Sequence, residues 1–130
     1  MIFNMVGGGG KGKHITGSFT SVNNGSGTST QNSFNVSGVT FDPKMICIKR
    51  TSYVNVENTP ELVSTAWWDF ENSVGSVSSA SNGGNGFVWN NSVMTATRSG
   101  SVLTVAINNC SFAGDMYEGG YGTYQYHIYG

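Results

Sequence analysis

Short apolar stretches separated by polar turns recur along the chain, and their period is that of β-strands. Side chains alternate between the two faces of a strand, so every second residue shares a face. This alternation predicts strands over residues 13–20 and 28–36. The apolar residues that share a face in these two segments are Ile15 with Phe19 and Phe34 with Val36. No segment of useful length has the period of an amphipathic helix, so an all-β fold is expected.

Two further segments predict the centre of this fold. Residues 45–48 are continuously apolar, as expected of a central strand that is buried on both faces. Residues 93–97 and 102–107 flank the polar sequence 98–101, which is a hairpin signal. In the second strand of the hairpin, Thr104 and Ala106 are expected to face outwards. The residues predicted to be buried are Ile46, Ile48, Leu103, Val105 and Ile107.

The last fourteen residues are unusually aromatic. Nine of the fourteen residues from 117 to 130 are Tyr or Gly. Such a strand must be held by a sheet, because its rings would otherwise stand in water. The expected alternation places Tyr124, Tyr126 and Ile128 on one face and Gln125, His127 and Tyr129 on the other.

Turn signals at a spacing of about 8–12 residues are typical of a sandwich or barrel. A chain of 130 residues also suits one domain. We therefore expect a single antiparallel β-sandwich, jelly-roll-like, over residues 13–130. Residues 1–12 combine a short apolar segment with four glycines and are expected to form an N-terminal glycine-rich docking arm. The apolar side chains of this assembly arm are Ile2, Phe3, Met5 and Val6.

The charge balance excludes some classes of partner. Charged residues make up 10% of the chain, against about 25% in ordinary globular domains. A net charge of −1 gives no field that would attract nucleic acid or an anionic membrane. No apolar run approaches the roughly 18 residues of a membrane-spanning helix, so no membrane insertion is expected. Such low charge gives little colloidal repulsion, which suits a protein packed in an assembly.

Catalytic, metal and cofactor motifs are weak in this sequence. Residues 7–13 match the first positions of a phosphate-binding loop, but His14 follows where Ser or Thr would bind magnesium. His14 and His127 have no carboxylate or Cys at metal-binding spacing, so they are interpreted as satisfied sheet histidines. Two pairs of carboxylates lack a calcium-loop signature, Asp69 with Glu71 and Asp115 with Glu118. We expect no enzymatic activity and no catalytic, metal or cofactor site.

The two cysteines, Cys47 and Cys110, are too few for a disulfide framework. Each lies in or beside an apolar run, so both are interpreted as buried free thiols. The sequence leaves open whether they are close enough in space for a disulfide.

Residues 51–92 carry the candidate recognition surface. Trp67 and Trp68 are adjacent in a short strand, so their rings point to opposite faces. One ring can serve the core, and the other must be covered by a loop, a neighbour or a ligand. Trp89 follows a segment rich in Asn and Gly. Trp67, Trp68 and Trp89 are the candidate contacts, with structural packing, subunit contact and glycan contact all left open.

Several short motifs together resemble small bacteriophage structural modules found in tail-fibre and baseplate-associated proteins of phages and prophages. The motifs are a Gly-x-Phe-Thr strand at residues 17–20, the strand residues 34–36, the turn Phe41-Asp42-Pro43-Lys44 into an apolar strand, and the closing aromatic residues 124–130. The resemblance implies a non-enzymatic virion protein whose partners are other virion proteins.

Two positions on the particle are compatible with this resemblance. The first is a tail-fibre or baseplate module that contacts the host surface as a trimer or other cyclic homo-oligomer, with a host-surface glycan as a further partner. The second is a capsid decoration protein on the outer surface of the head, anchored through residues 1–12. The resemblance favours the first, whereas a stand-alone domain with a glycine arm favours the second.

Overall fold

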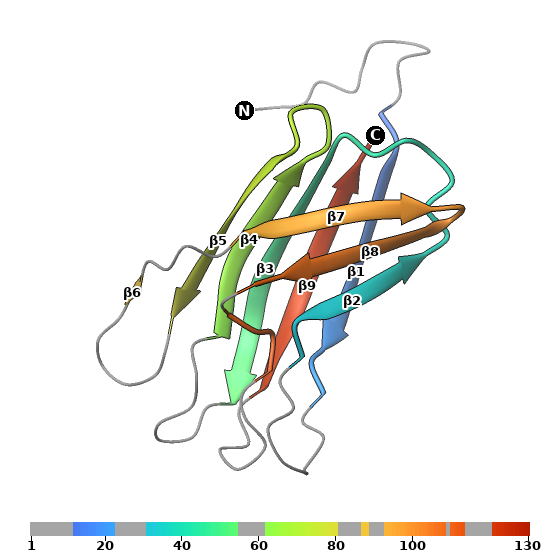
Figure 1. Ribbon diagram of the computed structural model, residues 1–130. Helices are drawn as coiled ribbons and strands as arrows, with labels where there is room; N and C mark the ends of the chain where they lie inside the picture. The colour runs from blue at the N-terminus through green and yellow to red at the C-terminus, as the bar shows by residue number, and fades with distance from the viewer. Residues whose placement is uncertain are drawn as a thin grey trace.

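The computed structural model describes residues 12–22, 31–54, 62–80, 87–88, 93–108, 110–113 and 121–130. Within these ranges every regular element is a β-strand, and no helix occurs. The strands form two antiparallel sheets that pack against each other (Figure 1). The predictions of an all-β fold and of two packed antiparallel sheets are therefore confirmed.

The larger sheet, called sheet A, has the strand order β1-β9-β3-β4-β5-β6. Its strands are β1 (His14–Thr20), β9 (Tyr121–Tyr129), β3 (Met45–Val54), β4 (Leu62–Asp69), β5 (Val74–Ala80) and the two-residue β6 (Phe87–Val88). The smaller sheet, sheet B, has the order β2-β8-β7. Its strands are β2 (Ser33–Ser37), β8 (Val102–Ile107) and β7 (Met94–Ser99). The strands of sheet B cross those of sheet A steeply (Figure 1).

The core lies between the two sheets. The five side chains predicted to be buried are at most 5% exposed, with Ile46 and Ile48 on β3 and Leu103, Val105 and Ile107 on β8. Thr104 is exposed and Ala106 half-buried, as the alternation of the hairpin predicts. Burying each such aliphatic side chain contributes on the order of 1.5–3 kcal/mol. Apolar burial between the sheets is therefore the main stabilising term.

An aromatic cluster fills one end of this core. The ring of Phe19 stacks on Phe34 with ring centres 4.0 Å apart and on Tyr124 with centres 5.1 Å apart. Phe112 meets the three other rings edge-on, which is a favourable geometry for aromatic pairs. The hydroxyl of Tyr124 donates a hydrogen bond of 3.0 Å to the carbonyl oxygen of Phe112. Burial raises the pKa of Tyr124 above its ordinary value of 10.

The aromatic segment near the end of the chain is a central strand. β9 pairs with β1 along one edge and with β3 along the other, so the prediction that a sheet holds it is confirmed. Tyr124 and Ile128 are fully buried, and Tyr126 packs against the core beside them. Gln125, His127 and Tyr129 lie on the opposite face, as predicted. Their register partners on β3 alternate along that strand with residues that are buried in the core.

The apolar run of residues 45–48 is buried on one face only. Ile46 is 0% and Ile48 2% exposed, whereas Met45 and Cys47 point to the other face and are half-buried. Sheet B covers one face of sheet A, and no described strand covers the other. The prediction that this strand is buried on both faces is therefore wrong.

The second strand predicted from the alternation is shorter than expected. The structure places β2 at Ser33–Ser37, and residues 28–30 of the predicted strand lie outside the described residues. Phe34 and Val36 still share one face, opposite Val105 and Leu103 of β8. The residues of the predicted arm, Ile2, Phe3, Met5 and Val6, also lie outside the described part of the chain.

Candidate functional site

The face of sheet A that points away from sheet B, called here the outer face, carries its side chains in rows. The rows arise because the registers of five neighbouring strands are continuous. From β1 to β5, the first row is His14, Tyr129, Met45, Asp69 and Val74. The second row is Thr16, His127, Cys47, Trp67 and Ser76, and the third is Ser18, Gln125, Lys49, Thr65 and Ser78. Aromatic and sulfur-containing side chains therefore gather in the first two rows.

The two histidines contact each other across β1 and β9. Nε2 of His14 lies 3.0 Å from Nδ1 of His127, and the ring centres are 5.2 Å apart. These two distances place both nitrogens close to the line between the ring centres, as in an in-line N–H···N hydrogen bond. One nitrogen donates and the other accepts, so the two rings share one proton at this contact. The interpretation of both residues as satisfied sheet histidines agrees with this geometry.

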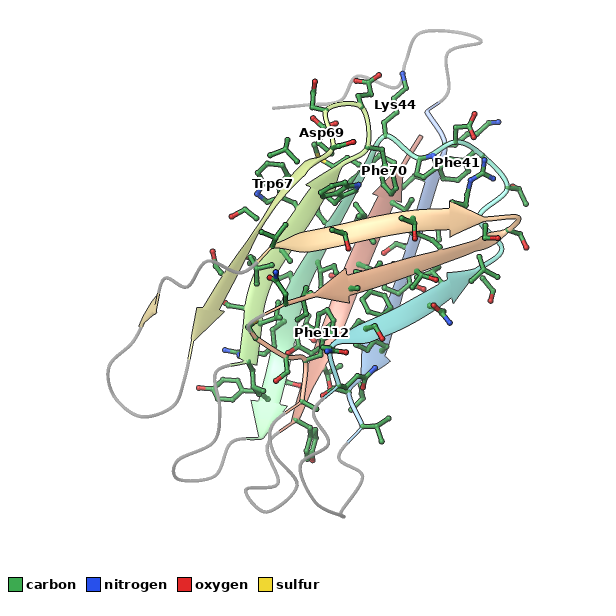
Figure 2. All side chains as sticks on the ribbon, viewed as in Figure 1. Phe41, Lys44, Trp67, Asp69, Phe70 and Phe112 are labelled. Carbon is green, nitrogen blue, oxygen red and sulfur yellow. The ribbon has the colours of Figure 1, made fainter. Side chains whose placement is uncertain are left out.

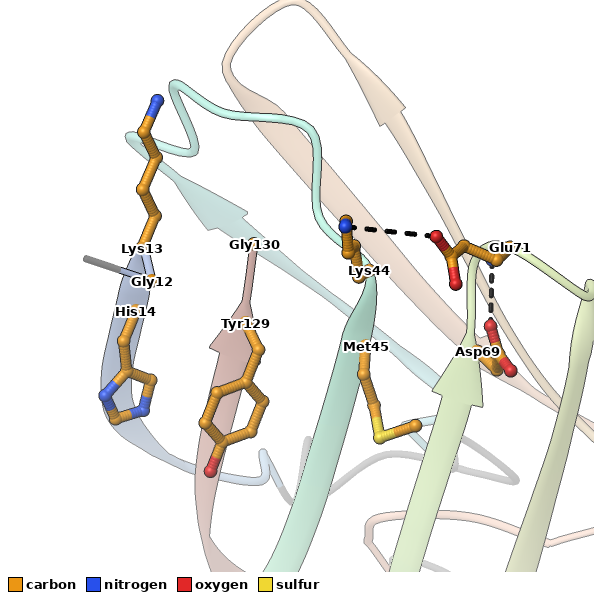
Figure 3. A pocket seen from close by; sticks show the side chains of 9 residues that line it. All are labelled: Gly12, Lys13, His14, Lys44, Met45, Asp69, Glu71, Tyr129 and Gly130. Atoms are coloured by element: carbon orange, nitrogen blue, oxygen red, sulfur yellow. Dashed lines mark hydrogen bonds and ion pairs between the residues drawn. The ribbon is translucent and has the colours of Figure 1, made fainter. Parts of the chain in front are cut away.

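Tyr129 extends this pair to three rings, called here the ring platform (His14, His127 and Tyr129). The ring centre of Tyr129 lies 4.7 Å from that of His14 and 6.1 Å from that of His127. The planes of the three rings differ by no more than 13°. His14 and Tyr129 form an offset stack, because parallel rings whose centres are only 4.7 Å apart would clash if they lay in one plane. Figure 3 looks onto this side of sheet A and shows the rings of His14 and Tyr129 face-on.

Trp67 is the second aromatic feature of the outer face. Its side chain is 39% exposed, on the strand next to Cys47 (Figure 2). An open hollow of about 520 Å³ lies between Trp67 and His127, with Met45 and Cys47 in its lining. A second hollow of about 400 Å³ also touches Met45 and continues towards Tyr129. Met45 lines both hollows.

Charged side chains border the second hollow at the end of the sheet. Nζ of Lys44 lies 4.0 Å from Oε1 of Glu71 (Figure 3). The carboxylate of Asp69 accepts hydrogen bonds from the backbone amides of Glu71 and Asn72 and from the side-chain amide of Asn72. The side-chain bond from Asn72, followed by these backbone bonds, lowers the pKa of Asp69. Asp69 is therefore an ionised acceptor that also shapes the β4–β5 turn.

The reactive groups of this face do not form a nucleophile or a metal centre. Burial raises the pKa of the Cys47 thiol, so the protonated form is favoured. Within the described residues, no group of three or more His, Cys, Asp or Glu side chains is placed to hold a metal ion. No helix in the described part of the chain is long and apolar enough to cross a membrane.

The structure separates the tryptophans that the sequence proposed as contacts. Trp67 lies on the outer face, whereas Trp68 points inwards and packs against the core. Trp89 lies outside the described residues. Adjacent residues of a strand point to opposite faces, so one of the two neighbouring tryptophan rings packs against the core and the other lies at the surface, as expected.

The cysteines are also separated. Cys47 lies on the outer face and Cys110 packs against the core, and the two are not joined in a disulfide. Both are half-buried, so the interpretation that they are buried is only partly right.

Sequence reasoning missed the ring platform. The alternation of residues 124–129 did place His127 and Tyr129 on one face. The pairing of β1 with β9 brings His14 beside them, although His14 and His127 are 113 residues apart. Sequence motifs cover short stretches of chain, so they do not indicate that residues so far apart in the sequence are paired.

No family model, curated protein or solved structure matches this chain. Its function is therefore inferred from its residues and their geometry.

Proposed function

We propose that this chain is a non-enzymatic structural protein of a bacteriophage particle, a tail-fibre or baseplate-type module that contacts the host surface. The resemblance of its strand and turn motifs to such modules supports this proposal. The proposal includes a jelly-roll-like sandwich, assembly as a trimer or other cyclic homo-oligomer, and residues 1–12 as the assembly arm.

The contrast between the two faces of sheet A carries the contact part of the proposal. The inner face is covered by sheet B, whereas the outer face bears Trp67 at 39% exposure and three further rings. Contiguous aromatic surface on a soluble domain marks a site of interaction, because its exposure to water is unfavourable. Aromatic residues are also enriched at the centres of interfaces. The outer face is therefore the contact surface in this proposal.

The chemistry of the outer face supports a binding role over a catalytic one. Cys47 is held as a protonated thiol, which is a poor nucleophile. The nitrogens of His14 and His127 that face each other are engaged in their mutual hydrogen bond. A general base must be within reach of a substrate proton, and these two nitrogens are already committed.

Capsid decoration is the second candidate for the position on the particle. That candidate depends on an arm that anchors the domain to the capsid. Residues 1–11 of the arm lie outside the described residues, so no structural observation favours this alternative.

Imaging of the virion tests the proposal directly. Particles of the phage or prophage that encodes the chain would be purified, analysed by mass spectrometry and labelled with gold-tagged antibody to the chain. Label at the fibres or baseplate is the expected result, and antibody pre-absorbed with the purified chain serves as the control. Label spread over the head would support capsid decoration instead. Purified particles that lack the chain would refute both positions.

A further inference from the structure

We infer that the outer face of sheet A binds an oligosaccharide, with one sugar ring on the ring platform and a second contact at Trp67. This inference rests on the proposed host-surface contact and specifies its site and the chemical class of its ligand.

The platform matches the apolar face of a pyranose ring. A pyranose carries C–H groups on its faces and hydroxyl groups around its edge. The rings of His14, His127 and Tyr129 are parallel to within 13°, so their faces point the same way and together form a stepped aromatic surface. Figure 3 shows the rings of His14 and Tyr129 on this side of the sheet, where His14 is exposed and Tyr129 half-buried. Sugar C–H groups can pack on such a surface while their hydroxyls remain at its border.

The platform is held in place before any ligand arrives. The hydrogen bond of 3.0 Å between His14 and His127 fixes the two imidazoles relative to each other. Both residues stand on strands that pair over seven successive positions. Side chains that are already ordered lose little entropy on binding, so more of the contact energy remains for affinity.

Polar groups border the platform where the sugar hydroxyls would lie. On one side, Lys44 and Glu71 line the hollow of about 400 Å³ together with the platform residue Tyr129. On the other side, Gln125 and Lys49 line the hollow of about 520 Å³. Ammonium groups donate hydrogen bonds, carboxylates accept them and an amide does both. This combination suits hydroxyl groups, each of which is both donor and acceptor.

The position of Trp67 indicates a ligand longer than one sugar. His127, Cys47 and Trp67 are register partners on three neighbouring strands. His127 and Trp67 are therefore two strand spacings apart, or about 10 Å. Met45 lines both the hollow between them and the hollow beside Tyr129. A chain of sugars lying across the strands would contact both aromatic features.

The charge of the protein argues against a nucleic acid on the same rings. Bases also stack on aromatic platforms, but such sites lie in a positively charged groove that follows the phosphates. This chain has a net charge of −1, and Lys44 is paired with Glu71 at the border of the face. An uncharged or weakly charged sugar does not need a basic groove.

A glycan array with the purified full chain tests the inference. The array would carry hexoses, N-acetylhexosamines, deoxyhexoses, sialylated glycans and bacterial surface polysaccharides. Binding to at least one class is expected, and the best oligosaccharide is then titrated by calorimetry. Trp67→Ala and Tyr129→Ala should each weaken binding by roughly tenfold or more, as truncation of a central aromatic contact does. Tyr129→Phe keeps the ring and should bind nearly as well as the original chain.

The matched control is Thr97→Ala on β7, whose side chain is exposed and belongs to sheet B. Its affinity should be unchanged. Thermal melting shows whether each variant is folded. If an alanine variant is not folded, Trp67→Phe or Tyr129→Leu is used in its place. Trp67→Phe should keep much of the affinity, and Tyr129→Leu should lose it.

Three outcomes would overturn the inference. One is a chain that binds no glycan on the array. Another is a set of folded variants that all bind as tightly as the original. The third is self-association of the chain that disappears in Trp67→Ala while no glycan is bound, because the outer face would then be an interface between copies. Gold label on the fibres in the virion experiment would leave the proposed function standing in each case.

Discussion

The indole ring of Trp68 lies against Gly75, its register partner on the neighbouring strand β5. A β-carbon at Gly75 would come within 2.5 Å of the carbonyl oxygen of Trp67, 2.9 Å of Cε3 of Trp68 and 3.0 Å of the carbonyl oxygen of Met94 on β7. These are closer than ordinary van der Waals contacts, and two of them are to backbone oxygens. The missing side chain of Gly75 therefore allows sheet A to accommodate Trp68 where β7 of sheet B approaches.

Gly75→Ala is expected to destabilise the fold by about 1–3 kcal/mol, the usual cost of forcing an extra methyl group into a packed interior. Urea denaturation followed by tryptophan fluorescence measures the change. Ser76→Ala, one residue along the strand and on the outer face, should change stability by less than about 0.5 kcal/mol. Equal effects of the two substitutions would contradict the close approach at Gly75.

Trp67 and Trp68 are expected to respond differently to truncation. Trp68→Ala removes a ring that packs against the core and should cost about 3 kcal/mol of unfolding free energy. Trp67→Ala removes a ring that is 39% exposed and should cost less than about 1 kcal/mol. Melting and ligand binding are measured on the same samples. A loss of stability on truncating Trp67 as large as that at Trp68 would show that Trp67 is a packing residue.

Removal of residues 124–130 is expected to abolish folding. The truncation deletes most of β9, which separates β1 from β3, and it exposes the backbone edges of both neighbours. The shortened chain should aggregate or lose its cooperative melting transition, followed by circular dichroism. Tyr129→Phe in the full chain is the control and should melt normally. A soluble truncated chain with a cooperative transition would contradict the central position of β9.

Alkaline pH is expected to destabilise the protein through Tyr124. Burial raises the pKa of Tyr124 above its unfolded value of 10, so the unfolded state loses this proton first as the pH rises. The stabilising contribution is complete below pH 10 and is lost progressively above it. Urea denaturation between about pH 8 and 11 measures this slope.

Tyr124→Phe isolates this contribution. The substitution removes the hydrogen bond to the carbonyl oxygen of Phe112 and should cost about 1–2 kcal/mol at neutral pH, because a buried acceptor is left unpaired. Its stability should fall less steeply above pH 10 than that of the original chain. Identical slopes for the two proteins would assign the alkaline transition to other groups.

The period-two pattern sufficed to predict the fold class because sheets bury one face of each strand. It placed Ile46, Leu103 and Val105 in the core, and it divided β9 correctly between Tyr124 and Gln125. The pattern was misleading at Met45 and Cys47. Both of these apolar side chains lie on the outer face of sheet A, which no described strand covers.

The candidate site was less accessible to prediction. Trp67 was proposed from its aromatic character and its neighbour Trp68, which is local information. The ring platform needs the pairing of β1 with β9, because His14 joins His127 and Tyr129 only through that register. Pairing between strands that are far apart in the sequence depends on the whole topology, and short motifs do not encode it.

The position of β9 between β1 and β3 also has a consequence for how the protein is made. His14 and His127 are 113 residues apart, so a ribosome completes β1 long before its partner strand exists. Until β9 emerges, the nascent chain carries two unpaired strand edges and an incomplete core, which is the kind of species that aggregates. Sheet A can therefore close only after synthesis of residues 121–129, so the domain is expected to fold as one unit rather than strand by strand.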